Sequence, residues 1–385
     1  MRSSILLASL ACAAAATVPD SALAQERRLE RPEARYAEPF SMIAGIRELP
    51  DGKVLVSDPI EEMFVRIDLT TGQATQLGRV GQGPGEYKTP DRIFAQPDGS
   101  TLLTDLGNGR ISVFGADGRY RESFPIVQGN NAGAGPGGGR PMFILASQSD
   151  AQGRLYFQQM GMGGIDSAAV LRYDRRAQKI DTVAFVKVAP PITRTTGTAN
   201  NQSVMMSPPV YPRQDAWAVA PDGRLAIVRA ANYSVEWVTP SGRVKGAPVA
   251  FRAVPIRDAE KQEWLDRLGS GVGVSMENRN GQMTTSFSRG RAGQGRPEAS
   301  TMTWPEAKPP FSPSGAMVTP EGELWVERSV PAGTSQEYDT FNAQGAHTGK
   351  VTVPARSQVI GFGRGTAYLV RLDADELQYL ERYRR

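Results

Sequence analysis

The chain has 385 residues, 40% of them hydrophobic and 22% charged, with a formal net charge of +4. This composition is that of a globular protein with enough apolar material for a large core, which excludes a disordered chain. The positive excess is small and no Lys/Arg block is interleaved with aromatic residues, so the sequence argues against nucleic-acid partners.

The first 24 residues have the pattern of a signal peptide. Arg2 is a minimal positive start, residues 3–18 are apolar and rich in alanine, and Ala22-Leu23-Ala24 offers small residues before a cleavage site. The apolar stretch is too short for a membrane span. We therefore expect cleavage near Ala24 and a periplasmic or secreted mature chain with no transmembrane segment.

The single cysteine, Cys12, lies inside this segment. A lipoprotein would carry its lipid on Cys12, but the residues before it match a lipobox poorly. We expect a mature chain without cysteine, disulfide or thiol chemistry.

One unit recurs along the rest of the chain: a tight Gly turn between two apolar strands, a polar loop, a third strand and a further Gly turn. Asp-Gly between short β-rich runs is a strong hairpin signal. The spacings of the first-turn glycines are 47, 54, 70, 99 and 43 residues, which suits four-stranded sheets with insertions. These glycines are Gly52, Gly99, Gly153, Gly223, Gly322 and Gly365.

The repeats predict an all-β fold, a six-bladed β-propeller with four-stranded antiparallel blades. The chain ends before blade six has a fourth strand, so we expect residues 29–40 to supply it and to close the ring. We expect residues 25–385 to form a single domain. Its blades are expected at residues 41–80, 89–125, 141–187, 214–251, 311–353 and 357–385 plus 29–40.

The second repeat is preceded by Gly81-Gln82-Gly83-Pro84-Gly85-Glu86-Tyr87 and Pro90, and it contains Asp105-Leu106-Gly107-Asn108-Gly109-Arg110-Ile111 and Phe114. This stretch resembles the NHL-repeat-like, six-bladed propellers that bacteria export. The resemblance is good over residues 46–119, looser over blades four to six and weakest in blade three. It implies the fold and export but no single activity, because this fold hosts both binding modules and enzymes.

Three long connections are expected on one face of the disc, which we call the top face. The Gly turns lie at the bottom, so the between-blade connections at residues 125–141, 188–213 and 252–311 must lie at the top. Long insertions that crowd one end of a scaffold favour a functional surface, the alternative being neutral drift in tolerant loops.

The longest insertion predicts a short helix between blades four and five. Asp258 can cap it, Trp264, Leu265 and Leu268 share a face, and Gly269 ends it. Residues 270–297 are rich in Gly, Arg and Ser, which predicts a mobile segment. We interpret this insertion as a lid or a docking arm.

The residue six places after each first-turn glycine is expected at the top end of a second strand, near the channel. Guanidinium groups suit carboxylate or phosphate, so the arginine side of this ring can bind an anion. The alternative is that these residues pair with each other or with neighbouring loops. The ring is Asp58, Asp105, Gln159, Arg229, Arg328 and Arg371, and Glu86 and Tyr87 complete the ligand-binding candidates. The resemblance implies that Asp105, with Asn108 and Arg110, fixes a loop.

Seven methionines fall in the predicted top loops. Clustered thioethers give an adaptable apolar surface or can hold Cu(I), and simple gap filling is the alternative. They are Met160, Met162, Met205, Met206, Met276, Met283 and Met302.

His347 is the only histidine. This argues against a Ser-His-Asp hydrolase, a His-ligated zinc or copper site and a histidine-dependent lyase. Catalysis would have to use carboxylates with Ca²⁺, and Asp58, Asp105 and Glu86 are the candidates. We assign no catalytic residue, metal ligand or cofactor.

The sequence thus favours an exported binding module that recognises a peptide, glycan or protein partner on its top face. One alternative is a calcium-assisted hydrolase or lyase on a propeller scaffold. Another is a structural protein of the cell envelope, which predicts no pocket. We expect a monomer by default.

Overall fold

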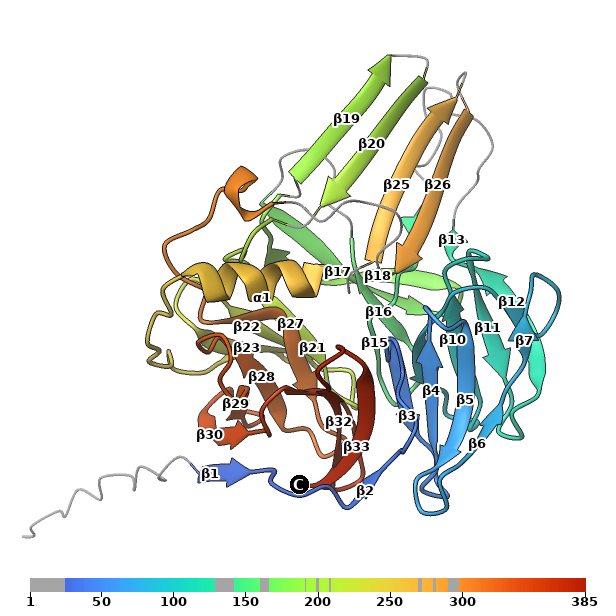
Figure 1. Ribbon diagram of the computed structural model, residues 1–385, viewed down its shortest axis with the longest axis horizontal. Coiled ribbons are helices and arrows are strands. Elements are labelled where there is room, and N and C mark those ends of the chain that lie inside the picture. The colour runs from blue at the N-terminus through green and yellow to red at the C-terminus, as the bar shows by residue number, and fades with distance from the viewer. Residues whose placement is uncertain are drawn as a thin grey trace, which may run out of the picture.

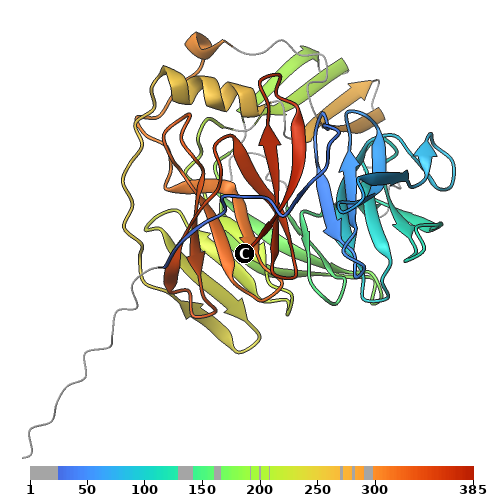
Figure 2. The same ribbon diagram turned by 60° about the horizontal axis from the view of Figure 1, so that its bottom comes forward.

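A ring of β-sheets makes up the protein, as the computed structural model shows (Figure 1, Figure 2). The structure describes residues 25–128, 142–159, 166–190, 192–198, 201–207, 209–268, 272–279, 282–289 and 298–385. The predicted signal peptide, together with Met160 and Met162, lies outside the described residues, so export stays a prediction.

Blades one and two are antiparallel sheets whose four strands follow chain order. Their second strands are buried along their whole length, whereas the last strand of blade one is exposed throughout. Strands buried on both faces are those that stack between neighbouring sheets. Blade one contains β3 (Gly45–Glu48), β4 (Val54–Asp58), β5 (Met63–Asp68) and β6 (Gln73–Gln76), and blade two contains β9 (Pro90–Ala95), β10 (Thr101–Asp105), β11 (Arg110–Phe114) and β12 (Tyr120–Pro125).

Blades three and four repeat this order. Blade three has the shortest first strand of the six and long third and fourth strands. Its strands are β15 (Gln148–Ser149), β16 (Leu155–Gln158), β17 (Ser167–Asp174) and β18 (Lys179–Lys187), and those of blade four are β21 (Ala216–Val219), β22 (Leu225–Arg229), β23 (Ser234–Thr239) and β24 (Gly242–Lys245).

Blades five and six complete the ring. Blade five contains β27 (Phe311–Val318), β28 (Leu324–Arg328), β29 (Glu337–Phe341) and β30 (His347–Thr352). Blade six contains β31 (Ser357–Gly363), β32 (Thr366–Leu372) and β33 (Gln378–Arg384) from the C-terminal end of the chain. These strands confirm the predicted six-bladed fold.

The N-terminal segment closes the ring, as predicted. Strand β2 (Ala34–Arg35) pairs antiparallel with β33 and is the fourth strand of blade six. The sequence did not predict a second contact, in which β1 (Gln25–Arg28) pairs in parallel with β30 and widens blade five to five strands. One N-terminal segment therefore covers the outer edges of two blades.

The hydrophobic core is divided into six clusters, one between each pair of adjacent blades. Val54 and Val56 of blade one meet Tyr368 and Val370 of blade six in one of them, so the first and last blades share a buried core as other neighbouring blades do. The other five clusters join blades one and two, two and three, three and four, four and five, and five and six.

The six first-turn glycines explain why the repeat shows in the sequence. All six have positive φ, between 65° and 92°, which glycine adopts without steric cost. They join first to second strands on the bottom face, and the loops between second and third strands therefore lie on the top face.

The two longest insertions pair with each other on the top face (Figure 1). Strands β19 (Ile192–Thr198) and β20 (Asn201–Ser207) follow blade three, and β25 (Val272–Arg279) and β26 (Gln282–Arg289) follow blade four. Strand β20 pairs antiparallel with β25, which makes one four-stranded sheet. The sequence did not predict this sheet, because the pairing depends on residues about 70 positions away.

Helix α1 (Asp258–Leu268) confirms the predicted helical insertion between blades four and five. Its start differs in detail from the prediction. The backbone N–H of Arg257 donates to Glu260 Oε2 at 3.0 Å, while Asp258 pairs with Lys261 at 2.9 Å. The remaining short elements are β7 (Arg79–Val80), β8 (Glu86–Tyr87), β13 (Val127–Gln128), β14 (Met142–Phe143) and the 3-10 helix Ala299–Thr301.

Candidate functional site

The residues predicted as a ring lie where second strands end at the top face. Asp58, Asp105, Arg229 and Arg328 are the last residues of β4, β10, β22 and β28. Gln159 follows β16 directly and is exposed, and Arg371 is the second-to-last residue of β32. The repeat therefore placed these residues at equivalent positions.

The two aspartates hold loops in place. Asp58 is fully buried and accepts the backbone N–H groups of Met42 at 2.9 Å, Ile60 at 2.9 Å and Glu61 at 3.1 Å. Burial raises the pKa of Asp58 above its ordinary value, and these three hydrogen bonds reduce the rise. The carboxylate of Asp58 thus orders the loop on either side of its strand.

Asp105 has the same role in blade two. Its Oδ1 accepts the N–H groups of Lys88 at 3.1 Å and Thr89 at 3.0 Å, and its Oδ2 accepts from Asn108 Nδ2 at 2.7 Å. Arg110 lies 3.6 Å from the same oxygen. These contacts agree with the loop-fixing role that the resemblance implied.

Glu86 and Tyr87 are engaged in the connection between blades one and two. Glu86 pairs with Arg79 at 2.6 Å and accepts the N–H of Gly83 at 2.7 Å, and these two contacts lower the pKa of Glu86. Tyr87 is fully buried, and its hydroxyl accepts from the Phe64 backbone at 3.2 Å. Neither residue lines the groove or the cleft described below.

Each of the three arginines pairs with a buried carboxylate from the third strand of its own blade. Arg229 lies 3.2 Å from Glu236, and Arg328 lies 3.1 Å from Asp339. Arg371 lies 3.0 Å from Glu381. The arginines therefore neutralise buried acids, and each remains between about a fifth and a third exposed at the top face.

Sequence reasoning missed these buried partners. Asp215, just before β21, belongs with them, because it pairs with Arg229 at 2.7 Å and accepts the N–H groups of Lys187 and Ala230. The available signal was an acidic residue inside an otherwise apolar strand, as in Val235-Glu236-Trp237. In the part of the chain that the structure describes, no hydrogen bond or ion pair joins two of the eight predicted residues.

A groove on the top of blade five is the concave site that includes one of the predicted residues, Arg328. Its volume is about 580 Å³. One wall is the loop from Arg328 to Pro331 after β28, and the other is the segment from Arg252 to Arg257 that leads into α1. Glu337 and Lys350, from the two outer strands, close one end.

The chemistry of the groove is an apolar floor with a cationic rim. Val254 is buried, and Ala253, Pro255, Val330 and Pro331 add further apolar surface. Four cationic residues line the rim, against two acidic residues. The cations are Arg252, Arg257, Arg328 and Lys350, and the acids are Glu260 and Glu337.

Both acidic side chains of the groove already have partners within the protein. Glu260 is buried and accepts the N–H groups of Ala332 and Arg257, each at 3.0 Å. Burial alone would raise the pKa of Glu260, but these hydrogen bonds outweigh it and lower the pKa. Glu337 pairs with Lys350 at 3.0 Å.

The two exposed arginines of the groove have no side-chain partner among the described residues. Arg252 and Arg257 are both exposed, and the guanidinium groups make no hydrogen bond or ion pair with any described residue. A guanidinium has five N–H donors in a fixed planar arrangement that matches an oxyanion. The groove therefore presents free donors beside an apolar surface.

Helix α1 fixes one wall of the groove. Lys308 is buried, pairs with Glu263 of the helix and donates to the carbonyl of Val330 at 2.9 Å. Tyr211 donates to the carbonyl of Glu260 at 2.6 Å, so the insertion after blade three supports the same helix. The wall is thus built from three segments that are distant in sequence.

The carboxylates that the sequence offered for calcium are not arranged as a calcium site. Ca²⁺ takes roughly six to eight oxygen ligands, whereas Asp58, Asp105 and Glu86 lie on three different strands and each accepts N–H donors. Among the residues that the structure describes, no three His, Cys, Asp or Glu side chains are grouped to hold a metal ion.

No family model matches the sequence, and neither does any curated protein. Within the described residues, none of the helices has the length and hydrophobicity that a bilayer crossing requires. The architecture on its own defines the class of protein, a six-bladed β-propeller with a top-face groove.

Solved structures with a similar course of the chain include three proteins of low identity. The calcium-binding protein regucalcin of Agrobacterium tumefaciens is 13% identical, with 94% of this chain and 97% of that chain covered and a TM-score of 0.41. A gluconolactonase of Xanthomonas campestris is 12% identical, with 94% and 96% covered and a TM-score of 0.41. Virginiamycin B lyase of Staphylococcus aureus is 12% identical, with 91% and 98% covered and a TM-score of 0.38. At these identities and TM-scores the similarity transfers no activity or ligand to this chain.

Proposed function

We propose that the chain is an exported binding protein whose groove on blade five takes the acidic part of a peptide, glycan or protein partner. The observation that supports this proposal is the pair of exposed, uncommitted arginines, Arg252 and Arg257, next to an apolar floor. Arg328 lies in the same groove, so one member of the predicted anion-binding ring contributes to it.

The physical basis is the balance between donors and acceptors. Glu260 and Glu337 have partners inside the protein, so they do not compete for a ligand. An incoming carboxylate can accept charge-assisted hydrogen bonds from two guanidinium groups while its carbon chain covers Val254 and Pro255. A groove of about 580 Å³ is within the usual range for small-molecule sites.

The test uses fluorescence anisotropy with labelled acidic probes, an octaglutamate peptide and an oligogalacturonate. The variant Arg252→Gln/Arg257→Gln should bind either probe at least about tenfold more weakly, because two charge-assisted hydrogen bonds are lost. Arg364→Gln is the control, since Arg364 is an exposed arginine in the bottom turn of blade six. Equal affinity of the double variant and the wild type for a bound probe would refute the groove as the binding site.

The calcium-assisted hydrolase or lyase remains the alternative. By their printed names, the solved neighbours are a calcium-binding protein and enzymes, which is closer to this alternative than to a binding module. Thermal unfolding with Ca²⁺ and with EDTA separates the two, because a metal that binds the folded state raises the melting temperature.

The structural alternative predicted a surface without a pocket. The groove on blade five is an observation against it. If no acidic probe binds and Ca²⁺ does not change the melting temperature, the structural alternative is favoured.

A further inference from the structure

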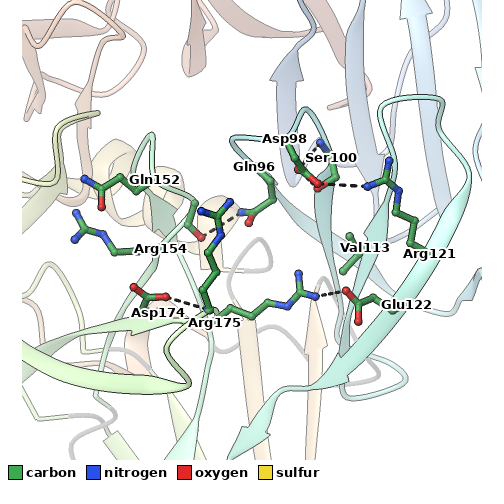
Figure 3. Close-up of a pocket in the computed structure, with 12 residues that line it drawn as sticks. Gln96, Asp98, Ser100, Val113, Arg121, Glu122, Gln152, Arg154, Asp174 and Arg175 are labelled. Atoms are coloured by element: carbon green, nitrogen blue, oxygen red, sulfur yellow. Dashed lines mark hydrogen bonds and ion pairs between the residues drawn. The ribbon is translucent and has the colours of Figure 1, made fainter.

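A second concave site lies on the bottom face, between blades two and three (Figure 3). We call it the lower cleft. Its walls are the turns Gln96–Ser100, Gln152–Arg154 and Asp174–Arg176, together with Arg121 and Glu122 of β12. Its volume is about 290 Å³. Because the turns between first and second strands line it, it lies on the face opposite to the groove.

The two blades are joined at the base of the cleft. Gln96 donates from Nε2 to the carbonyl of Gly153 at 3.2 Å, which links the first turn of blade two to that of blade three. A side chain at position 153 would place its Cβ 2.7 Å from Gln96 Oε1, and Gly153 has φ of 78°. Glycine is therefore needed for the close approach that shapes the cleft.

Four arginines line this small space, and they retain hydrogen-bond donors. Arg154 uses Nε for Asp150 at 2.6 Å, and Arg121 uses Nη1 for Asp98 at 3.3 Å. Arg175 uses Nη2 for Glu122, and its guanidinium lies 5.0 Å from the ring centre of Phe124. Figure 3 shows Arg175 reaching toward Glu122, on the wall that carries Arg121, while Arg154 extends to the opposite side.

Arg176 has no side-chain partner of this kind. Its side chain is exposed and makes no hydrogen bond or ion pair with any residue that the structure describes, although its backbone N–H donates to Asp174 at 2.9 Å. Each guanidinium has five N–H donors, so four arginines supply many more donors than these contacts use.

The carboxylate acceptors of the cleft have more of their hydrogen-bond capacity occupied than the arginine donors do. Asp98 Oδ1 accepts the N–H of Ser100 at 3.0 Å and its hydroxyl at 2.5 Å. Asp174 Oδ1 accepts two backbone N–H groups, those of Arg176 and Ala177. The lining therefore holds a surplus of donors, which a ligand rich in acceptors can satisfy.

The ion pairs in the cleft can be exchanged for a ligand. Arg121 and Asp98 are each about half exposed, and Glu122 is 58% exposed. Ion pairs this exposed contribute little to stability, because water screens them and holding two long side chains costs entropy. An oxyanion can thus replace Asp98 and Glu122 as the partner of Arg121 and Arg175.

We propose that the lower cleft is a binding site for a small ligand that carries an oxyanion, namely a phosphate, sulfate or carboxylate group. Arg175 and Arg176 form the centre of this site, and Arg121 lies beside it on the wall from blade two. The site is separate from the groove on blade five and does not depend on it.

The test is a titration with inorganic sulfate, inorganic phosphate and acetate at constant ionic strength, followed by calorimetry. Sulfate or phosphate should bind the wild type, and Arg175→Gln/Arg176→Gln should weaken that binding at least about tenfold. Arg364→Gln, on the same face, should bind as the wild type does. Arg252→Gln/Arg257→Gln should also leave this binding in place, which separates the cleft from the groove.

The outcomes are distinct. Sulfate or phosphate bound more tightly than acetate indicates a phosphorylated or sulfated ligand, whereas acetate bound as tightly indicates a carboxylate. Binding that is equal in the wild type and in Arg175→Gln/Arg176→Gln, or no binding of any of the three anions, would overturn the proposal. An unfolding scan of each variant without ligand shows that a loss of binding is not a loss of fold, since these arginines are on the surface.

Discussion

Replacing Asp339 by asparagine removes the charge on which polar side chains of blades four and five converge. Arg328 Nη1 lies 3.1 Å from Oδ1 and 3.3 Å from Oδ2, and His347 Nε2 lies 3.1 Å from Oδ1. The hydroxyl of Tyr233 donates to Oδ2. Asp339 itself is fully buried, so the asparagine would leave Arg328 without its carboxylate and would keep only one acceptor oxygen.

The expected loss follows from these contacts. Removing one partner of a buried ion pair costs about 3–5 kcal/mol, because the other charge is left uncompensated. The side chain of Arg328 is 22% exposed, which lets water solvate part of its charge. We therefore expect the lower end of this range, about 3 kcal/mol of unfolding free energy at pH 7.

The loss should depend on pH. Burial alone would raise the pKa of Asp339, but the hydrogen bonds from His347 and Tyr233 and the charge of Arg328 outweigh it and lower the pKa below its ordinary value. A carboxyl with a lowered folded-state pKa stabilises the protein above its unfolded-state pKa, and the contribution is lost as the pH falls through the folded-state pKa. The difference between wild type and variant should therefore be full at pH 7 and should shrink as the pH falls below the ordinary aspartate pKa toward the lowered one.

Urea unfolding followed by tryptophan fluorescence measures this difference. The matched control is Asp375→Asn, since Asp375 is exposed and its side chain has no partner among the described residues. A loss for Asp339→Asn no larger than for the control at pH 7 would refute the account of the arginine partners. An equal loss at pH 7 and at pH 3 would refute the electrostatic part of it.

Two further predictions concern parts of the fold that the repeat did not reveal. Val204→Cys/Met276→Cys should form a disulfide on oxidation, because these positions are opposite each other across β20 and β25, and mass spectrometry detects the product. Val204→Cys/Gln282→Cys is the control. If the first pair cross-links no more readily than the control pair, the pairing of the insertions is wrong. Gly349→Ala should release β1 from blade five, because a Cβ at position 349 would overlap the backbone of Gln25. Hydrogen exchange of residues 26–28 should then become fast while the melting temperature changes little, and retained protection of these amides would contradict the predicted overlap.

The sequence could predict the blades because their signals are local. Six glycines with positive φ sit between apolar strands, and neighbouring residues such as Val54, Leu55 and Val56 report burial on both faces. The closing strand could be predicted from the number of strands, since the last blade had only three and its outer edge lacked a partner. Helix α1 was equally local, because its apolar residues recur within a few positions of the chain.

The candidate site could be predicted only in part. The repeat located Arg229, Arg328 and Arg371 at equivalent strand ends, but not their partners on other strands. An arginine binds a ligand or pairs with a buried carboxylate according to whether an acidic side chain lies beside it. Strand register decides which acidic side chain lies there. Export stays a prediction of the sequence, and calcium binding stays part of the alternative that the sequence left open.

The sequence by itself determined the six-fold repeat, the side of the disc on which the insertions lie and the end of the strand on which each charged residue stands. Tertiary structure alone decided that β20 pairs with β25, that β1 covers blade five, and that residues 252–257 face residues 328–331 across a groove. The physical reason is distance along the chain. Turn geometry and burial depend on adjacent residues, whereas sheets between insertions, ion pairs between strands and the walls of a cleft form between segments that only the closed ring brings together.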